Sequence, residues 1–257
     1  MSEYSSLAAV ERTLVIIKAL VGKTNGASVS KLMADTGISK SVVSRILKTL
    51  KENHYVEQDP ETRFYRLTYD YINLALLHYH ALGIDGMFLP TLRKIAQELK
   101  ELVQITFVRN EKIYFVQKAE GDNPLKVADM VGKEAPLHCS AAGKLWLSSL
   151  PEEEVKRIIG ERGMKRYTEK TITELQELLN ELASIRQSGY AVSREEFHQG
   201  VVGVAVPILF HYQPNKITAI IVIAAPSIRM TETKMKNAVN VCHKHIHALH
   251  TQQSATQ

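Results

Sequence analysis

The residues best suited to contact another molecule lie in the stretch GISKSVVSRILKTL, which runs from Gly37 to Leu50. Its apolar residues recur at i, i+3, i+4 and i+7, the spacing of one helix face: Val43, Ile46, Leu47 and Leu50. The other face carries small hydroxyl groups and cations: Lys40, Ser41, Ser44, Arg45 and Lys48. Free amides at a helix N-terminus, beside such side chains, suit contacts to phosphate groups and to base edges in a major groove.

Side-chain chemistry indicates a role for each position of this helix. Lys40 and Ser41 lie in the first turn, where phosphate or base contacts are made, and Ser44 suits either kind of contact. Arg45 can bind a phosphate, or a guanine through two parallel hydrogen bonds. Val42 has two open interpretations, contact with a thymine methyl group or a partly buried helix edge. Basic helix faces usually serve only to solvate a protein. The elements next to this helix must therefore show whether its polar face contacts DNA.

A second group with possible chemistry is His138 beside Cys139, which resembles a cysteine nucleophile with its base. If this segment is extended, neighbouring side chains point to opposite faces and the two cannot pair. His198 is a further candidate for an enzyme of this type. Gly143-Lys144 is similar to the end of a P-loop, but His138 occupies the position of its first glycine. We therefore expect a protein that is not an enzyme.

The C-terminal stretch CHKHIHALH places His243, His247 and His250 on one face of a helix, and the first two have metal-ligand spacing. An apolar stripe lies beside them: Met235, Val239, Cys242, Ile246 and Leu249. The histidines then flank the buried side of the helix, an interpretation that predicts no metal site and no cofactor. Metal sensing through these histidines is the alternative.

Composition limits the class of protein. A chain of 257 residues favours two domains, and a hydrophobic fraction of 45% with a charged fraction of 23% is typical of globular proteins. Two cysteines and the absence of a signal peptide predict a cytoplasmic location. The longest apolar runs are shorter than the roughly 20 residues of a membrane helix, so we expect no membrane partner. The net charge of +5 permits a polyanionic partner.

Helices must position the polar face. A first helix is predicted by an apolar pattern expected to pack on its neighbours: Leu7, Val10, Leu14, Ile17 and Val21. A shorter helix begins near Ser30 and is stopped at Thr36-Gly37, and Ser39 is a suitable N-cap for a third helix from Lys40 to about Asn53. Two helices joined by a short turn with glycine form the helix-turn-helix pattern.

The next segment alternates apolar and polar residues on both sides of the turn 59–62, which predicts a hairpin with strands at 54–57 and 63–67. Such a hairpin after a helix-turn-helix is a wing, and Arg63 and Arg66 could reach phosphates or a minor groove. An apolar helical pattern from Tyr71 to Leu82 then predicts a linker helix.

The rest of the chain alternates helices and strands. Strands are expected at 103–109 and 112–118, around 125–130, and in the runs that begin at Val201 and Ile217, with a loop at 211–216. Helices are expected over 89–100, from about Ser140, Pro151 and Thr173, and after Thr231. The fold class is therefore α+β, with a mostly antiparallel sheet flanked by helices.

The run TGISKSVVSRILKTLKENHYVEQD with RFYRL resembles the DNA-binding region of the IclR family of bacterial transcriptional regulators. Three later motifs are similar to the same family and follow its order: LHCSAAGKLWLSSL, GYAVSREEFHQGVVGVAVPI and AAPSIRMT. The resemblance implies a winged helix-turn-helix in residues 1–70, a linker helix in 71–84 and a GAF-like effector-binding domain in 85–257. It also implies a homodimer or homotetramer.

The resemblance also implies an effector pocket built from these three motifs. By position its residues are Ser140, Ala141, Ala142, Ser193, Gly203, Val222 and Ala224. The amides of Ala141 and Ala142 at a helix N-terminus suit a carboxylate, whereas Ser140 has the alternative role of capping its helix. Family members that bind acids carry an aspartate at 193, a cysteine at 203 and serines at 222 and 224. These departures predict a roomier, less polar cavity and a ligand larger or less oxygen-rich than a two- or three-carbon keto acid.

Together these features predict a ligand-responsive regulator of transcription. The resemblance implies repression, the commoner outcome for such regulators. The candidate DNA contacts are Ser39, Lys40, Ser41, Val42, Ser44, Arg45, Lys48 and Arg63. The expected partners are double-stranded operator DNA with palindromic half-sites and a small effector, in one interpretation a carboxylate-bearing metabolite.

Overall fold

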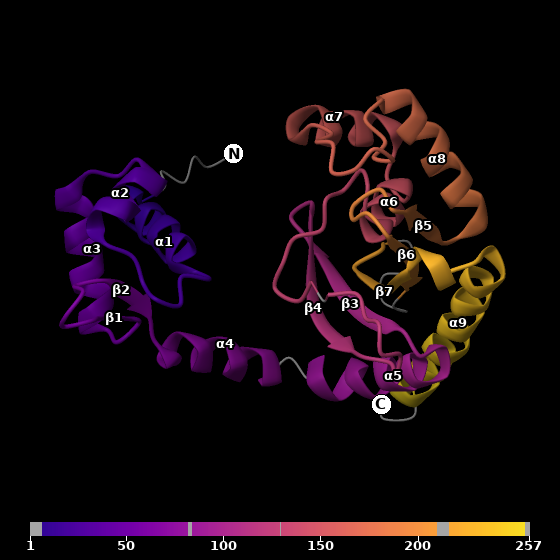
Figure 1. Ribbon diagram of the computed structural model, residues 1–257, viewed down its shortest axis with the longest axis horizontal. Helices are drawn as coiled ribbons and strands as arrows, with labels where there is room; N and C mark the ends of the chain where they lie inside the picture. Colours follow the sequence, from indigo (N-terminus) through magenta and orange to yellow (C-terminus); the bar gives the residue numbers. More distant parts are fainter. Residues whose placement is uncertain (1–6, 82–83, 129, 210–215, 255–257) are drawn as a thin grey trace. The chain divides into compact units, whose positions relative to one another are not determined.

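The computed structural model describes residues 7–81, 84–128, 130–209 and 216–254. The chain divides into two compact units, Met1–Gly83 and Ile84–Gln257 (Figure 1). The first holds α1 (Ala8–Leu20), α2 (Val29–Thr36), α3 (Lys40–Glu52), β1 (Val56–Gln58), β2 (Tyr65–Leu67) and α4 (Tyr69–Ala81). Three helices followed by a hairpin form the predicted winged helix-turn-helix, and α4 corresponds to the expected linker helix.

The core of the first unit is formed by one face of each of its first three helices. Ile16 and Leu20 of α1, Leu32 of α2 and Val43 of α3 are all buried. The register expected for the first helix is wrong, because four of its predicted core residues are at least half exposed: Leu7, Val10, Leu14 and Val21. Only Ile17 of that stripe packs against the core. The core of the unit contacts a neighbouring stripe of α1. The predicted stripe therefore remains an exposed apolar surface.

The turn between α2 and α3 follows the expected chemistry. The Ser28 hydroxyl accepts a hydrogen bond from the Lys31 amide (3.1 Å) and begins α2. Gly37 ends α2 with φ = 69°, a left-handed conformation that favours glycine, and its amide donates to the Met33 carbonyl (2.9 Å). Ser39 occupies the N-cap position of α3, although its hydroxyl caps no helix amide.

The hairpin strands are shorter than predicted. His54 (φ = 63°) and Arg63 (φ = 60°) adopt left-handed backbone conformations, which interrupt the extended chain at the first residue of each expected strand. The Asp59 carboxylate accepts hydrogen bonds from the Glu61 and Thr62 amides (3.0 and 2.8 Å) and fixes the tip. The wing is therefore a short ladder with a long, internally bonded turn.

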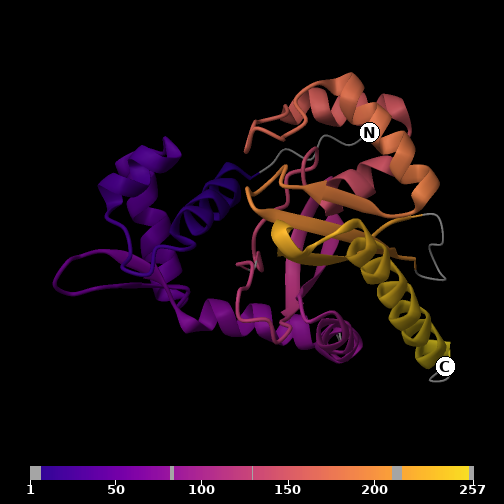
Figure 2. The same cartoon turned by 45° about the vertical axis from the view of Figure 1, so that its right-hand side comes forward.

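The second unit is built on an antiparallel sheet in the order β4-β3-β7-β6-β5. Its strands are β3 (Leu102–Arg109), β4 (Lys112–Ala119), β5 (Ala191–Arg194), β6 (Val201–Ile208) and β7 (Ala219–Pro226). Helices α5 (Ile84–Leu99) and α9 (Glu232–Ser254) cover one face, and α6 (Ala141–Ser148), α7 (Glu152–Arg162) and α8 (Leu175–Ser188) cover the other (Figures 1 and 2). The α+β class is confirmed.

Each face of this sheet has its own core because side chains alternate along a strand. On β7, Ile221 and Ile223 pack with residues of α5 and α9. The intervening Ile220 and Val222 pack with residues of α6, α7 and α8. Burial on both faces explains why β7 is a continuous apolar run.

Three details differ from the sequence-based expectation. The described residues of 125–130 form no strand, and β5 was not predicted because it is short and ends in polar residues. The start of the expected linker lies at Tyr69 rather than Tyr71. Residues 211–215 of the expected loop lie outside the described residues. None of the described helices is long and apolar enough to cross a membrane.

Candidate functional site

The polar face of α3 is fully on the surface of the first unit. All five of its predicted contact residues are exposed: Lys40, Ser41, Ser44, Arg45 and Lys48. Val43 and Leu47 on the opposite face have no exposed surface, which holds the orientation of the helix. Val42 is half-buried and packs against the core of the unit, so the helix-edge interpretation describes its main contact.

The cations of this face are available to a partner. Among the described residues, Lys40 and Arg45 form no ion pair, and Lys48 approaches only Glu52 at 3.8 Å, where both side chains are exposed. Exposed pairs of this kind contribute little stability and separate readily. The face therefore presents positive charge, and Glu52 is the one acid among the described residues that approaches it.

The wing offers one further cation of the same kind. Arg63 is exposed next to the tip of the hairpin and forms no ion pair with any described residue. Arg66, by contrast, has its Nε 2.6 Å from Glu57 Oε1 on the paired strand. Of the two arginines named from the sequence, Arg63 is the one that is free for a phosphate.

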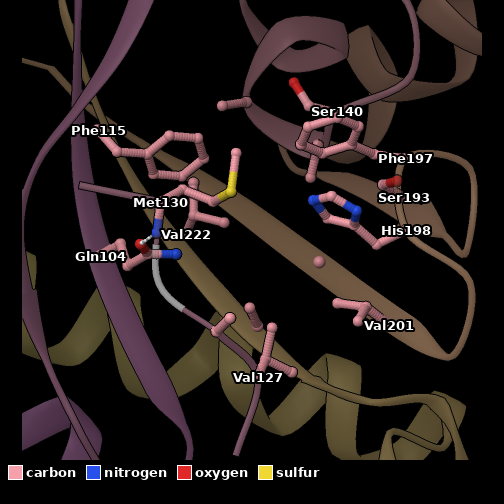
Figure 3. A pocket seen from close by; sticks show the side chains of 15 residues that line it. Gln104, Phe115, Val127, Met130, Ser140, Ser193, Phe197, His198, Val201 and Val222 are labelled. Carbon is pink, nitrogen blue, oxygen red and sulfur yellow. Dashed lines mark hydrogen bonds between the residues drawn. The ribbon is translucent and has the colours of Figure 1, made fainter. Parts of the chain in front are cut away.

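A cavity in the second unit brings together all seven predicted effector residues (Figure 3). Strand register explains part of this: Ser193 of β5 lies opposite Gly203 of β6, which lies opposite Ala224 of β7. One row further along the sheet, Val222 of β7 lies opposite Gln104 of β3. Four strands therefore form the floor of one site.

The N-terminus of α6 lies over this floor. A Cβ atom placed on Gly203 would be 3.5 Å from the Cβ of Ala141. The Ser140 hydroxyl donates to the Pro136 carbonyl (2.6 Å) and accepts from the Gly143 amide (3.0 Å), so Ser140 does cap its helix. The Ala141 and Ala142 amides have no acceptor among the described residues and remain available to an anion.

The cavity is also lined by eight residues that the sequence did not identify: Gln104, Phe115, Val127, Ala128, Met130, Phe197, His198 and Val201. Phe115, Met130 and Phe197 occupy much of the room expected from the small residues, and the cavity volume is about 60 Å³. The lining is apolar as predicted, but the site is compact rather than roomy. A usable signal was Gln104, a long polar side chain between the apolar residues Val103 and Ile105.

The polar side chains of the cavity are few. The Ser193 hydroxyl donates to the Cys139 carbonyl (2.6 Å), and the Gln104 carboxamide oxygen accepts from the Met130 amide (2.9 Å). Burial, with a smaller effect of Lys133, lowers the pKa of His198, so its ring is neutral at neutral pH. Since none of the described lining residues carries a charged side chain, a ligand anion would depend on the α6 amides.

A buried ion cluster lies next to the α6 end of the cavity. Lys144 of α6 is 1% exposed, and its Nζ lies 2.7 Å from Glu196 Oε1 and 2.9 Å from Glu181 Oε1. Burial raises the pKa of Glu196 despite this cation, and Glu196 Oε2 has no hydrogen-bond partner among the described residues. The cluster joins α6 to α8 and to the loop that carries Phe197. The sequence did not reveal this role of Lys144.

The structure contains no nucleophile and base pair at His138 and Cys139. The segment is a turn, so the argument from an extended chain does not apply to it. The His138 ring is hydrogen-bonded to the Lys165 carbonyl (Nε2 to O, 2.9 Å). Burial raises the pKa of the Cys139 thiol to about 12. A thiol that stays protonated at neutral pH is a poor nucleophile.

Two of the three C-terminal histidines have described side chains. His243 and His247 are exposed rather than flanking the buried side of α9, and the side chain of His250 lies outside the described residues. His245 instead lies 2.9 Å from Glu98 of α5 (Nε2 to Oε2). In the described part of the chain, no group of three histidine, cysteine or acidic residues could hold a metal ion.

Two family models match the chain. The model of the IclR helix-turn-helix domain matches residues 9–60, and the model of the bacterial transcriptional regulator IclR C-terminal domain matches residues 77–249. Between them they cover both compact units.

Individual proteins are similar over nearly the whole chain. The HTH-type transcriptional regulator KdgR of Escherichia coli K12 is 28% identical over 93% of this chain and 89% of its own length. The HTH-type transcriptional repressor AllR of the same strain is 27% identical, over 88% and 83%. A crystal structure of an IclR regulator from a Silicibacter species shares the fold, with a TM-score of 0.82, 23% identity and 95% coverage of both chains. An IclR homologue from Microbacterium hydrocarbonoxydans, complexed with 4-hydroxybenzoate, has a TM-score of 0.79 and 18% identity over 95% and 100%.

Proposed function

The chain belongs to the IclR family of DNA-binding transcriptional regulators, which are not enzymes, and from this premise we propose that it is a ligand-responsive repressor acting in the cytoplasm. The observation that carries the proposal is the α3 face, with exposed Lys40 and Arg45 free of ion pairs and a free Arg63 on the wing. A major groove accepts such a helix, and the wing cation is suited to the adjacent backbone. The name of the relative AllR, a repressor, favours repression over activation.

A homodimer or homotetramer would bring two such faces to one operator. Exposed apolar side chains favour self-association. Those at least 46% exposed are Leu7 before α1, Val10 and Leu14 on α1, and Ile72, Leu74, Leu76 and Leu77 on α4. Two-fold symmetry of the protein implies a palindromic operator, with half-sites about one helical turn apart or a multiple of it.

The cavity is proposed to bind a small effector with a carboxylate and an apolar body. The Ala141 and Ala142 amides supply the anion seat, and the apolar lining disfavours very polar ligands such as two- or three-carbon keto acids. A homologue with the same fold is complexed with 4-hydroxybenzoate, a carboxylate with an apolar ring, which supports this ligand class. If the ligand prefers one arrangement of the dimer, it changes the separation of the two recognition helices and hence operator affinity.

The test is a gel shift of the purified protein on the DNA upstream of its own gene, with and without candidate acids. We expect a specific shift, a footprint with two-fold symmetry and a change in affinity with at least one acid. Binding no tighter than to unrelated DNA at the same salt concentration would contradict operator recognition. A thermal-shift screen in which only two- or three-carbon keto acids raise the melting temperature would contradict the proposed ligand class.

A further inference from the structure

A groove with a volume of about 440 Å³ lies between α1 and α3 of the first unit. Ile46 and Leu50 form part of its floor and belong to the buried core, whereas Val10 and Leu14 line it from α1 and are 53% and 50% exposed. Sites that hold small molecules fall in this range of size. Apolar side chains exposed around such a groove indicate a surface that another molecule covers.

The two hydroxyl groups of the groove are already satisfied. Thr13 Oγ1 donates to the Ala9 carbonyl (2.8 Å), and Thr49 Oγ1 donates to the Arg45 carbonyl (3.2 Å). Both threonines line the groove, and each bond lies within the threonine's own helix. Their hydroxyls therefore need no partner from a ligand, and the interior of the groove suits a hydrocarbon chain.

Positive charge borders the groove on both helices. Arg12 of α1 and Arg45 of α3 are exposed lining residues, and neither forms an ion pair with any residue that the structure describes. None of the described lining residues is acidic. Guanidinium groups bind carboxylates through charge-assisted hydrogen bonds. The groove thus complements a molecule that has an apolar chain and one anionic end.

The length of the groove limits the chain that it can hold. The lining residues of α3 run from Val42 to Leu50, which corresponds to about 12 Å along the helix axis. An unbranched aliphatic chain of medium length matches this distance. The effector cavity of the second unit, with a volume of about 60 Å³, suits a shorter molecule. The two sites therefore differ in the size of molecule that they accept.

We propose that the groove between α1 and α3 is a second ligand site, which binds a medium-chain aliphatic carboxylate. The chain covers Val10 and Leu14, and the carboxylate pairs with Arg12 and Arg45. Because Arg45 is also a candidate contact to DNA, the ligand and the operator compete directly for the first unit. This regulatory consequence rests on the proposed repressor function, whereas the ligand site itself does not.

The proposed self-association does not depend on this groove. The exposed apolar side chains of α4 that favour it, among them Ile72 and Leu77, lie outside the groove. A second copy of the chain is the alternative molecule that could cover Val10 and Leu14. Chemical protection of the groove distinguishes this alternative from the ligand.

The first experiment measures competition in the full-length protein, with decanoate as the probe. Calorimetry gives the dissociation constant of decanoate, and fluorescence anisotropy gives the operator affinity at constant ionic strength. At a decanoate concentration about ten times its dissociation constant, the operator affinity should fall about tenfold. Acetate has the charge without the chain, and decyl maltoside has the chain without the charge, so neither should lower it. Native operator affinity under saturating decanoate would overturn the competition.

Substitution of Arg12 separates ligand binding from DNA binding. Arg12 is not among the candidate DNA contacts, so Arg12→Met should keep the native operator affinity. Its affinity for decanoate should fall about tenfold, because a charge-assisted pair is lost. Arg93→Met removes an exposed arginine of α5 and should keep both affinities. Native decanoate affinity in Arg12→Met would overturn the site.

A thiol placed in the groove reports what covers it. Ala9 is exposed and lines the groove, whereas Lys18 is exposed on the same helix outside it. Under the same decanoate concentration, the reaction of Ala9→Cys with an uncharged disulfide reagent should slow about tenfold, and that of Lys18→Cys should not change. Equal rates with and without decanoate in Ala9→Cys would overturn the site. Slow reaction without decanoate that becomes faster on dilution would overturn it in favour of a second copy.

Failure of this proposal is distinguishable from failure of the proposed function. Calorimetry and thiol protection test the ligand site without DNA, so absence of decanoate binding overturns the site and leaves operator recognition untouched. A protein that binds no operator in the absence of decanoate contradicts the repressor function and the competition, while protection of Ala9→Cys still decides whether the ligand site exists.

Discussion

The polar face of α3 and the cavity of the second unit differ in how the chain assembles them. The face uses residues within nine positions of the sequence, Lys40 to Lys48, on a single helix whose opposite side is buried. The cavity draws on residues from Gln104 to Ala224, which a sheet and a helix N-terminus bring together. A long polyanion can be met by an exposed, charged surface, whereas a small molecule needs enclosure.

Lysine illustrates the same contrast. Lys40 on α3 is exposed and unpaired among the described residues, which suits contact with a partner. Lys144 on α6 is 1% exposed and contacts two glutamates, one of them buried. The first lysine can be replaced without damage to the fold, but the second compensates a charge that the fold has already enclosed. Substitutions at matched residue types can therefore separate the two regions.

The largest expected effect is that of Lys144→Met. Loss of the cation leaves Glu196 buried without compensation, and we expect the free energy of unfolding to fall by about 3–5 kcal/mol in urea denaturation. Lys40→Met, the matched control on α3, should change it by less than about 0.5 kcal/mol. A small loss in Lys144→Met would show that the cluster is open to solvent.

The stability of the Lys144→Met variant should also depend on pH in a characteristic way. Burial raises the folded-state pKa of Glu196 above its ordinary value of 4.5, and removal of Lys144 takes away the main interaction that opposes this shift. The folded variant then binds a proton that the unfolded chain lacks, so stability rises as the pH falls from above the raised pKa towards 4.5. Urea denaturation at pH 8 and pH 5.5 should show the deficit relative to the native chain shrinking at the lower pH.

A second comparison uses glycine in the two regions. A Cβ on Gly143 would lie 2.3 Å from the Leu137 carbonyl oxygen, so Gly143→Ala must displace the start of α6, and we expect a loss of about 3 kcal/mol. Gly37 has φ = 69° but no atom within 4 Å of an added Cβ. Gly37→Ala should therefore cost only about 1 kcal/mol. Equal losses in thermal denaturation would contradict close packing at the cavity wall.

A third prediction concerns binding rather than stability. Arg45→Ala should weaken operator binding by about 1–3 kcal/mol, measured by fluorescence anisotropy at fixed salt, with an unchanged melting temperature. Arg66 is paired with Glu57 across the wing, so Arg66→Ala should weaken binding less. Native affinity in Arg45→Ala at physiological salt would rule out this residue as a DNA contact.

The prediction with the smallest expected effect on the protein tests only which thiols are exposed to solvent. Burial raises the pKa values of both native thiols, Cys139 and Cys242, to about 12, so neither should react with a disulfide reagent at pH 8 in the folded protein. In Ser44→Cys one new thiol on the α3 face should react rapidly. All three should react in urea. Fast reaction of either native thiol before unfolding would show that the second unit opens in solution.

Much of the first unit could be predicted because its signals are local. Helical periodicity identified the buried face of α3 and hence its exposed residues, and Gly37 marked the turn by its conformational preference. The same reasoning selected the wrong stripe on α1, because two neighbouring stripes of that helix are apolar and only contact with α2 and α3 decides which is buried. Family resemblance located seven cavity residues that local patterns alone would not have connected.

The sequence by itself determined the division into two units, most of their helices and strands, the polar face of α3 and the absence of charged side chains at the resembling pocket positions. These features follow from local periodicity, from capping preferences and from motif order. Only the tertiary structure decided that Gln104, Phe115 and Phe197 share the cavity, that Lys144 contacts Glu181 and Glu196, and that Cys139 is buried. Strand register and helix packing set these distances, and both depend on contacts between residues far apart in the chain.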